Sequence, residues 1–226
     1  MDRLYRTRLL FGDAGLAKLK KTTVMVVGCG AVGSFAIEAL ARSGIGHLVI
    51  VDFDVVEESN INRQLFALTS TVGAAKVDVA AARVRDINPD IVVDALNLRW
   101  DENTDVDIVP DFVIDAIDCV ESKVALYKWA HKHSVPLISS MGAASKTDPT
   151  QIKIAPISRT TVCPLAARVR RMVRGAGISD FPAVFSTETP VPVAGHAKNL
   201  GSVITITGTF GLMLANYVIR ETIQNI

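Results

Sequence analysis

The chain has 226 residues, with 24 Lys and Arg against 23 Asp and Glu, so its formal net charge is +1. This balance argues against wholesale packaging of nucleic acid but leaves a local basic patch open. With 49% hydrophobic and 21% charged residues, the chain should fold around a sizeable core. Its cysteines, Cys29, Cys119 and Cys163, form no C-x-x-C pair, which argues against a disulfide scaffold and a structural zinc site. The charged first residues do not resemble a signal peptide, so we expect a cytoplasmic protein.

Short apolar runs alternate with helical patterns over the first two-thirds of the chain. We predict strands over residues 23–28, 47–52, 91–96, 112–117 and 136–140. The helices predicted between them cover residues 31–43, 71–88, 102–108 and 121–133. This repeated order predicts an α/β fold with a Rossmann-like, doubly wound and mostly parallel sheet.

The pattern changes after residue 140, where small residues and prolines become frequent. Residues 151–155 and 203–207 are predicted to be strands that extend the sheet, partly antiparallel, with a basic helix at 165–174 between them. Residues 203–219 are almost free of charge. Alternation of Thr with Val and Ile favours a buried strand and then a core helix there, with a membrane anchor as the alternative. We expect one domain, with a nucleotide-binding core at 1–140 and a substrate-side extension at 141–226.

A glycine-rich motif follows the first predicted strand. The sequence GCGAVG at residues 28–33 fits G-x-G-x-x-G and opens a helix. Gly28 permits the tight turn, Gly30 lets phosphates approach the backbone, and Gly33 allows close helix–strand packing. From Ala31 onward, the helix start offers unpaired N–H groups to an anion. Asp52 ends the second strand, where a carboxylate accepts hydrogen bonds from ribose hydroxyls. The combination predicts nucleotide binding.

Polar side chains are dense between Asp52 and Gln64, which distinguishes this chain from a simple dehydrogenase. Arg63 can bridge phosphate oxygens with its forked guanidinium, and Lys76 adds a second cation. Two cations suit a triphosphate whose pyrophosphate leaves, because negative charge grows on that group. Asp118, at the end of the fourth strand, is placed to hold Mg²⁺ on the same phosphates. Taken singly, each cation would more often be a solvated charge on a helix surface, but the joint arrangement favours a function.

These motifs resemble those of the ubiquitin-activating-enzyme-like superfamily, the ThiF, MoeB and HesA adenylyltransferases, from Tyr5 to the C-terminal helix. The resemblance implies ATP-dependent adenylation of a carboxylate. The implied nucleotide-binding residues are Gly28, Gly30, Ala31, Gly33, Asp52, Asp54, Asn60, Arg63, Gln64 and Lys76. The implied catalytic residues are Arg63, Lys76, Asp118 and Arg8, with Asp118 also the Mg²⁺ ligand. Arg8 matches an arginine that reaches the partner subunit's ATP site in that family, which implies a homodimer.

Within the superfamily, the chain is most similar to the tRNA threonylcarbamoyladenosine dehydratase family, through residues 39–46, 148–152, 164–166 and 184–188. This likeness implies that ATP activates the threonyl carboxylate on tRNA and that the nucleoside then cyclises. It also implies Mg²⁺, a monovalent cation, and a cysteine desulfurase with a sulfur acceptor as partners. Some members carry a cysteine before the 184–188 run; residues 181–183 hold none, which excludes a thioester there. The region 194–200 also looks short beside typical members.

Several features keep two interpretations. Arg168, Arg171 and Arg174 share one helix face, which is either a solvated surface or a contact for tRNA phosphates. Cys163 begins a helix, where it is either a cap or a thiol nucleophile; Cys29 and Cys119 are interpreted as small fillers. The four histidines show no metal-ligand spacing.

Two other functions compete with the dehydratase. One is an adenylyltransferase for the C-terminal glycine of a small ubiquitin-like sulfur carrier, which commonly needs a transfer cysteine and a zinc module. The other is a nucleotide-binding regulatory partner without catalysis, which the presence of Arg63, Lys76 and Asp118 disfavours.

Overall fold

The computed structural model describes residues 2–192 and 200–224. Its strands are β1 (Thr23–Val27), β2 (His47–Asp52), β3 (Val92–Asn97), β4 (Phe112–Asp115), β5 (Leu137–Ser140), β6 (Ile152–Pro156) and β7 (Pro182–Ser186). Its helices are α1 (Tyr5–Lys21), α2 (Gly33–Ser43), α3 (Lys76–Ile87), α4 (Val120–Lys132), α5 (Pro164–Gly175) and α6 (Ile204–Gln224).

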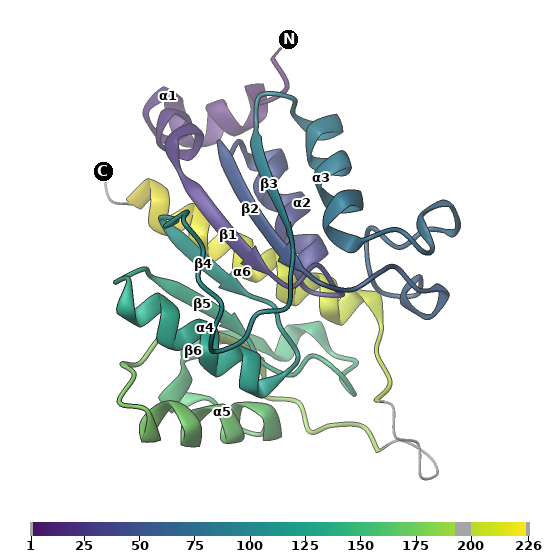
Figure 1. The fold of residues 1–226 in the computed structure, drawn as a ribbon, viewed down its shortest axis with the longest axis vertical. Helices are drawn as coiled ribbons and strands as arrows, with labels where there is room; N and C mark the ends of the chain where they lie inside the picture. The colour runs from purple at the N-terminus through teal and green to yellow at the C-terminus, as the bar shows by residue number, and fades with distance from the viewer. Residues whose placement is uncertain (1, 193–199, 225–226) are drawn as a thin grey trace.

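These strands form one seven-stranded sheet in the order β3-β2-β1-β4-β5-β7-β6 (Figure 1). Every neighbouring pair is parallel except β6 and β7, which are antiparallel. The predicted fold class, a mostly parallel doubly wound sheet with an antiparallel extension, is therefore confirmed. The carboxyl ends of β1, β2 and β4 meet at one edge, beside the point where strand order reverses, and ligands of such sheets bind there.

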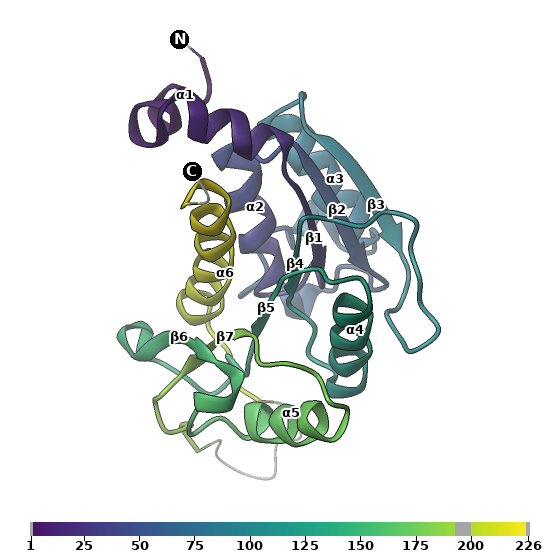
Figure 2. The ribbon, with the colours of Figure 1, turned by 90° about the vertical axis from the view of Figure 1, so that its left-hand side faces the viewer.

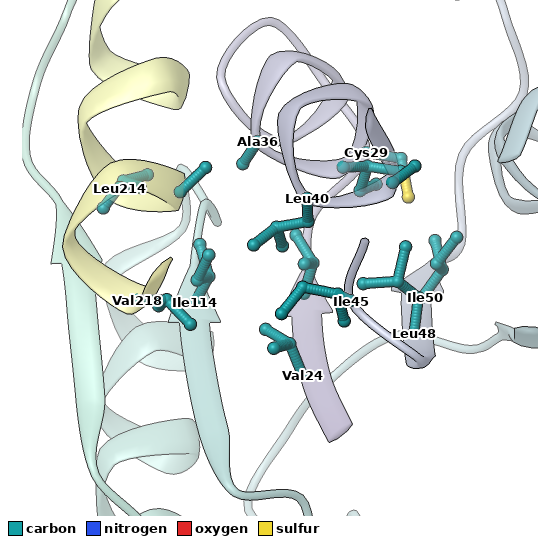
Figure 3. Close-up of a cluster of buried hydrophobic side chains, with 14 of the residues drawn as sticks. Val24, Cys29, Ala36, Leu40, Ile45, Leu48, Ile50, Ile114, Leu214 and Val218 are labelled. Carbon is teal, nitrogen blue, oxygen red and sulfur yellow. The ribbon is translucent and has the colours of Figure 1, made fainter. Parts of the chain in front are cut away.

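Helices cover both faces of the sheet. In Figure 2, α2 and α6 lie on one side of the strands and α4 lies on the other. The two cores follow the alternation of strand side chains, as β2 illustrates. Leu48 and Ile50 join the cluster beneath α2 and α6, whereas Val49 and Val51 join the cluster beneath α4 and α5. Figure 3 shows the first cluster, with Leu214 of α6 close to the α2 side chains.

The prediction of a strand at 203–207 is wrong, because α6 begins at Ile204. Its buried side chains Ile206, Phe210 and Leu214 recur at helical spacing, a signal that the shorter Thr–Val–Ile alternation masked. The second strand that extends the sheet is instead β7, which was not predicted from the sequence. It begins at Pro182, and the first residue of a strand is a position where proline's lack of an N–H group is tolerated. None of the helices in the described ranges has the length and apolarity to cross a membrane.

Two further element predictions need correction. No helix forms at 102–108, because Asp101 and Thr104 accept hydrogen bonds from backbone N–H groups and stabilise turns instead. The helix expected from residue 71 begins at Lys76, and Thr71 belongs to a 3₁₀ turn in which its Oγ1 accepts the N–H of Leu68. The 194–200 region lies outside the described residues except for Leu200.

Gly211 sets the spacing between α6 and α2. A Cβ on Gly211 would lie 2.3 Å from the Val32 carbonyl oxygen, which belongs to the backbone just before α2. We expect Gly211→Ala to lower the free energy of unfolding by about 1–3 kcal/mol through overpacking. Gly175→Ala is the matched control, because its Cβ would meet open space, and it should change stability by less than about 1 kcal/mol. Urea denaturation measures both, and equal stability of the two variants would contradict this packing.

Candidate active site

In the glycine loop between β1 and α2, Gly28 and Gly33 are packed too closely to carry a side chain. Gly28 has φ = 102°, and a Cβ on it would lie 2.7 Å from the carbonyl oxygen of Ala116. A Cβ on Gly33 would lie 1.7 Å from the carbonyl oxygen of Gly28. The loop therefore turns directly against the segment that follows β4, and it leaves N–H groups at the start of α2 for an anion.

Asp52 braces this loop from the end of β2. Its Oδ2 accepts the N–H of Cys29 at 2.6 Å, and its Oδ1 accepts the N–H of Asp54 at 2.8 Å. Cys29 is buried; burial first, and the Asp52 charge second, raise the pKa of its thiol well above the usual value. Cys29 is therefore a neutral filler beneath the loop.

The segment after β2 carries the two expected cations. The half-buried Arg63 donates from Nη1 to the Ser59 carbonyl at 2.7 Å and to Asn62 Oδ1 at 2.9 Å. The buried Lys76, the first residue of α3, forms an ion pair with Asp54 at 2.8 Å between Nζ and Oδ2. Each cation is already held by oxygen acceptors, so its position is defined before any ligand arrives.

Two amides complete the same region. Asn60 is buried, and its Oδ1 accepts the N–H of Glu57 at 3.2 Å within a 3₁₀ turn. The Gln64 amide nitrogen lies 3.8 Å from the position that a Cβ on Gly30 would take, so this side chain borders the glycine loop. The structure thus brings Asp52 and Gln64 to the glycine loop and holds Lys76 against Asp54 just after β2.

Asp118 is exposed in the loop between β4 and α4, three residues beyond the buried Asp115. An ion pair in the core near this loop was not predicted from the sequence. Asp115 and Lys123 lie 2.7 Å apart, and neither side chain has any exposed surface. Tyr127 also donates to Asp115, at 2.7 Å. The spacing of Lys123 and Tyr127, one helical turn apart on α4 and both on its buried face, was the available signal.

Arg8 belongs to α1. This helix lies at the end of the sheet where β1 begins, whereas the glycine loop follows the other end of β1 (Figure 1). It forms ion pairs with Asp2 at 2.8 Å and with Asp13 at 3.2 Å. The structure therefore does not bring Arg8 into the site of its own chain.

The arginines of the basic helix α5 make different contacts. Arg168 pairs with Glu121 of α4 at 2.5 Å, and Arg170 donates to the Thr160 carbonyl at 2.9 Å. The exposed Arg171 and Arg174 line, together with Arg170, a shallow hollow of about 390 Å³. The predicted stripe of three thus contains one arginine with a carboxylate partner and two that border the hollow.

The described cysteines and histidines do not come together as a metal centre. Within residues 2–192 and 200–224, no three His, Cys, Asp or Glu side chains converge to hold an ion. Cys163 is buried at the start of α5, where its sulfur accepts the N–H of Ala166 at 3.5 Å as a helix cap. Cys119, a half-buried thiol, donates to Glu121 at 3.3 Å. His196 lies outside the described residues.

Glu188 holds the loop after β5 against the end of β7. Its carboxylate accepts the backbone N–H groups of Thr147 and Asp148, each at 3.0 Å, and the Thr147 hydroxyl at 2.9 Å. These bonds, the Asp148 N–H first, lower the pKa of Glu188 below its usual value of 4.5. The buried Lys146 ammonium donates to the backbone carbonyl of Glu188.

A glycine-rich loop at the carboxyl end of β1, with Asp52 bonded to it and the Lys76–Asp54 ion pair close by, is typical of nucleotide-binding α/β domains. The chain belongs to the ThiF family, whose model matches residues 2–225. It is 50% identical over 197 residues to a tRNA threonylcarbamoyladenosine dehydratase of Bacillus subtilis, covering 85% of this chain and 78% of that protein. The Escherichia coli protein of the same name is 33% identical over 249 residues, 97% of this chain and 93% of that one. The crystal structure of the E. coli dehydratase TcdA with ATP has a TM-score of 0.92, at 34% identity, and covers 99% of this chain and 94% of that one.

Glu188→Gln should reduce stability at neutral pH but lose that effect in acid. A lowered folded-state pKa stabilises the protein above 4.5 and stops doing so as the pH falls through the lowered value. The melting-temperature difference between wild type and Glu188→Gln should therefore shrink as pH falls below about 4.5. Glu102→Gln, which removes an exposed carboxylate from a turn, is the control. A difference that stays constant with pH would show that the carboxylate does not carry these bonds.

Proposed function

We propose that this protein is an ATP-dependent dehydratase that adenylates and cyclises threonylcarbamoyladenosine in tRNA. The observation that carries the proposal is 50% identity over 85% of the chain to a dehydratase of that name, together with an intact set of nucleotide-site residues. The TcdA complex with ATP supports ATP as the co-substrate. In this proposal residues 1–140 bind the nucleotide, and residues 141–226 complete the substrate side of one domain.

The side chains of the glycine loop region and of the segment after β2 have separate proposed roles in that reaction. Asp52 binds the ribose, and the N–H groups of the glycine loop receive the phosphates. Lys76 exchanges Asp54 for a phosphate oxygen, and Arg63 neutralises charge that grows on the leaving pyrophosphate. Asn60 and Gln64 keep the phosphate side of the loop in shape.

Mg²⁺ fits Asp118, because this carboxylate is exposed at the carboxyl end of β4 and supplies the hard oxygen that the ion prefers. With a single protein carboxylate there, the remaining ligands would be phosphate oxygens and waters. When bound, the ion neutralises phosphate charge. A monovalent cation is a further proposed ligand, to which we assign no residue.

The chemistry balances without a protein nucleophile. A carboxylate oxygen of the threonyl group attacks the α-phosphorus, the bond to pyrophosphate breaks, and an acyl adenylate forms. A nucleophilic atom of the same modified nucleoside then attacks the acyl carbon and expels AMP, so that one water is lost overall. Since the attacking atom is intramolecular, the buried Cys163 needs no chemical role. The reaction consumes no sulfur, so a cysteine desulfurase and its acceptor would act by association rather than as reactants.

We further propose a cytoplasmic homodimer in which Arg8 serves the partner's site. Support comes from its position far from its own glycine loop and from the exposed Leu9 and Leu10 beside it, which are 64% and 75% accessible. A two-fold interface would bring each α1 to the other chain.

The product assay tests the function and the role of Asp118 together. Wild type, ATP, Mg²⁺ and tRNA carrying threonylcarbamoyladenosine should yield a nucleoside lighter by one water in mass spectrometry. Asp118→Asn should lose this product by about 100-fold or more while its circular dichroism stays unchanged, since one transition-state charge contact is worth that much. Asp90→Asn, on an exposed turn at the other edge of the sheet, is the control and should keep full activity. Normal turnover by Asp118→Asn would remove this residue from the site, and absence of product from wild type would reject the function.

The hollow on α5 is proposed to contact tRNA phosphates through Arg171 and Arg174. Each phosphate contact releases counterions, so Arg171→Gln or Arg174→Gln should each reduce the salt slope of log K for tRNA by about one unit. Arg168→Gln is the matched control, because its guanidinium already pairs with Glu121, and it should leave the slope unchanged. ATP affinity should stay the same in all three variants. Equal slopes throughout would mean that this helix face is merely solvated.

A further inference from the structure

The chain buries a complete ion pair directly behind Asp118. Asp115, the last residue of β4, and Lys123, on α4, have no exposed side-chain surface, and their charged atoms lie 2.7 Å apart. Neither residue reaches the surface where nucleotide or tRNA would bind, so the proposed reaction leaves both without a role.

The Asp115 carboxylate has a full set of donors. Its Oδ2 accepts from Lys123 Nζ, from the Tyr127 hydroxyl at 2.7 Å and from the Ser139 hydroxyl at 2.5 Å. Lys123 donates a second bond, to the Ser140 carbonyl at 2.8 Å. Burial, and then the Asp115 charge, raise the pKa of Tyr127, so its hydroxyl remains a donor. These contacts connect β4, β5 and α4 at one atom.

Stability alone gives a poor reason for this network. Taking two charges out of water is costly, and apolar residues of similar volume often serve as well or better in a folded core. A buried polar network whose members are all satisfied does, however, make its surroundings rigid. Its place, at the strand end from which the Asp118 loop departs, indicates where that rigidity is used.

The other carboxylate oxygen of Asp115 reaches the loop itself, since Oδ1 accepts the N–H of Ile117 at 3.0 Å. The preceding Ala116 is held from the opposite side. Its N–H donates to the Val27 carbonyl at 2.9 Å, and its own carbonyl occupies the space that a Cβ on Gly28 would need. The short path from Asp115 to Asp118 is thus fixed between the buried carboxylate and the glycine loop.

We propose that Asp115, Lys123, Tyr127 and Ser139 are positioning residues that fix the Asp118 carboxylate relative to the glycine loop. The inference deepens the proposed function, because it concerns how Asp118 is presented to nucleotide phosphates and their cation. These residues do not touch the substrate; they act through the backbone of residues 116–118.

Tyr127→Phe and Ser139→Ala test the proposal, since each removes one donor to Asp115 and leaves Lys123 in place. Ser140→Ala is the matched control on the same strand; it is also buried, and its hydroxyl donates to the Met141 carbonyl instead of to Asp115. Variants of Asp115 or Lys123 are less informative, because an unpaired buried charge can prevent folding. Three quantities are measured: amide exchange at Ile117 without nucleotide, calorimetric affinity for ATP with and without Mg²⁺, and steady-state kinetics.

The proposal predicts that Ile117 exchanges about tenfold faster in Tyr127→Phe and Ser139→Ala, and within about twofold of wild type in Ser140→Ala. It also predicts that kcat falls about tenfold in the first two variants with an unchanged KM for ATP, because the loop is misplaced and not lost. The gain in ATP affinity on adding Mg²⁺ should shrink in the same two variants. Equal exchange and equal kcat in all three variants would reduce the network to packing. Exchange at Ile117 needs neither tRNA nor turnover, so it decides this proposal even where wild type yields no cyclised product.

Discussion

The site depends on close backbone contact between two loops at the carboxyl edge of the sheet, the glycine loop after β1 and the segment after β4. Gly28 and Gly33 have no side chains, and this lets the carbonyl of Ala116 and the backbone after β1 pack in contact. Any Cβ at either glycine would overlap backbone atoms, which cannot rotate away as a flexible side chain can. The backbone of the glycine loop and the strand end that leads to Asp118 therefore form one rigid unit.

Other elements supply chemistry to that unit without forming it. Asp52 accepts the N–H of Cys29 in the glycine loop, and Lys76 at the start of α3 forms an ion pair with Asp54 just after β2. Behind the unit, Asp115 and Lys123 tie the same loop to α4. On the other face of the sheet, opposite α4, helix α6 packs closely against α2 at Gly211. This contact holds α2, the helix that follows the glycine loop, in place. Binding groups on separate strands thus share one scaffold, as preorganised charge stabilisation requires.

Much of this could be predicted from the sequence, and the reasons for success and failure are physical. The strands β1, β2 and β4 are short apolar runs that lead to α2, α3 and α4, and a parallel strand buried on both faces has this near-continuous apolar pattern. Residues 203–207 misled because β-branched residues and alternation also occur at the start of a buried helix; only Phe210 and Leu214 reveal the helical spacing. The loop at 102–108 failed since side-chain hydrogen bonds of Asp101 and Thr104 outcompete a marginal helix.

For the site, the motifs predicted a tight glycine loop with Asp52 beside it, because the glycine requirement of such a turn is local. They did not predict that Arg168 pairs with Glu121, or that Asp115 is buried with three side-chain donors, since those contacts join different helices and strands whose packing is a tertiary property. Arg8 shows the same limit, because its proposed role lies in the site of a second chain, which contacts within one chain do not display.

Isotope transfer tests most directly whether the protein activates a carboxylate as its adenylate. Threonylcarbamoyladenosine in tRNA with an ¹⁸O-labelled carboxylate is incubated with the protein, ATP and Mg²⁺, and the products are analysed by mass spectrometry. Ring closure that expels AMP must leave one labelled oxygen on AMP and none on pyrophosphate. Unlabelled AMP beside cyclised nucleoside, or label in inorganic phosphate with ADP as the co-product, would contradict the account.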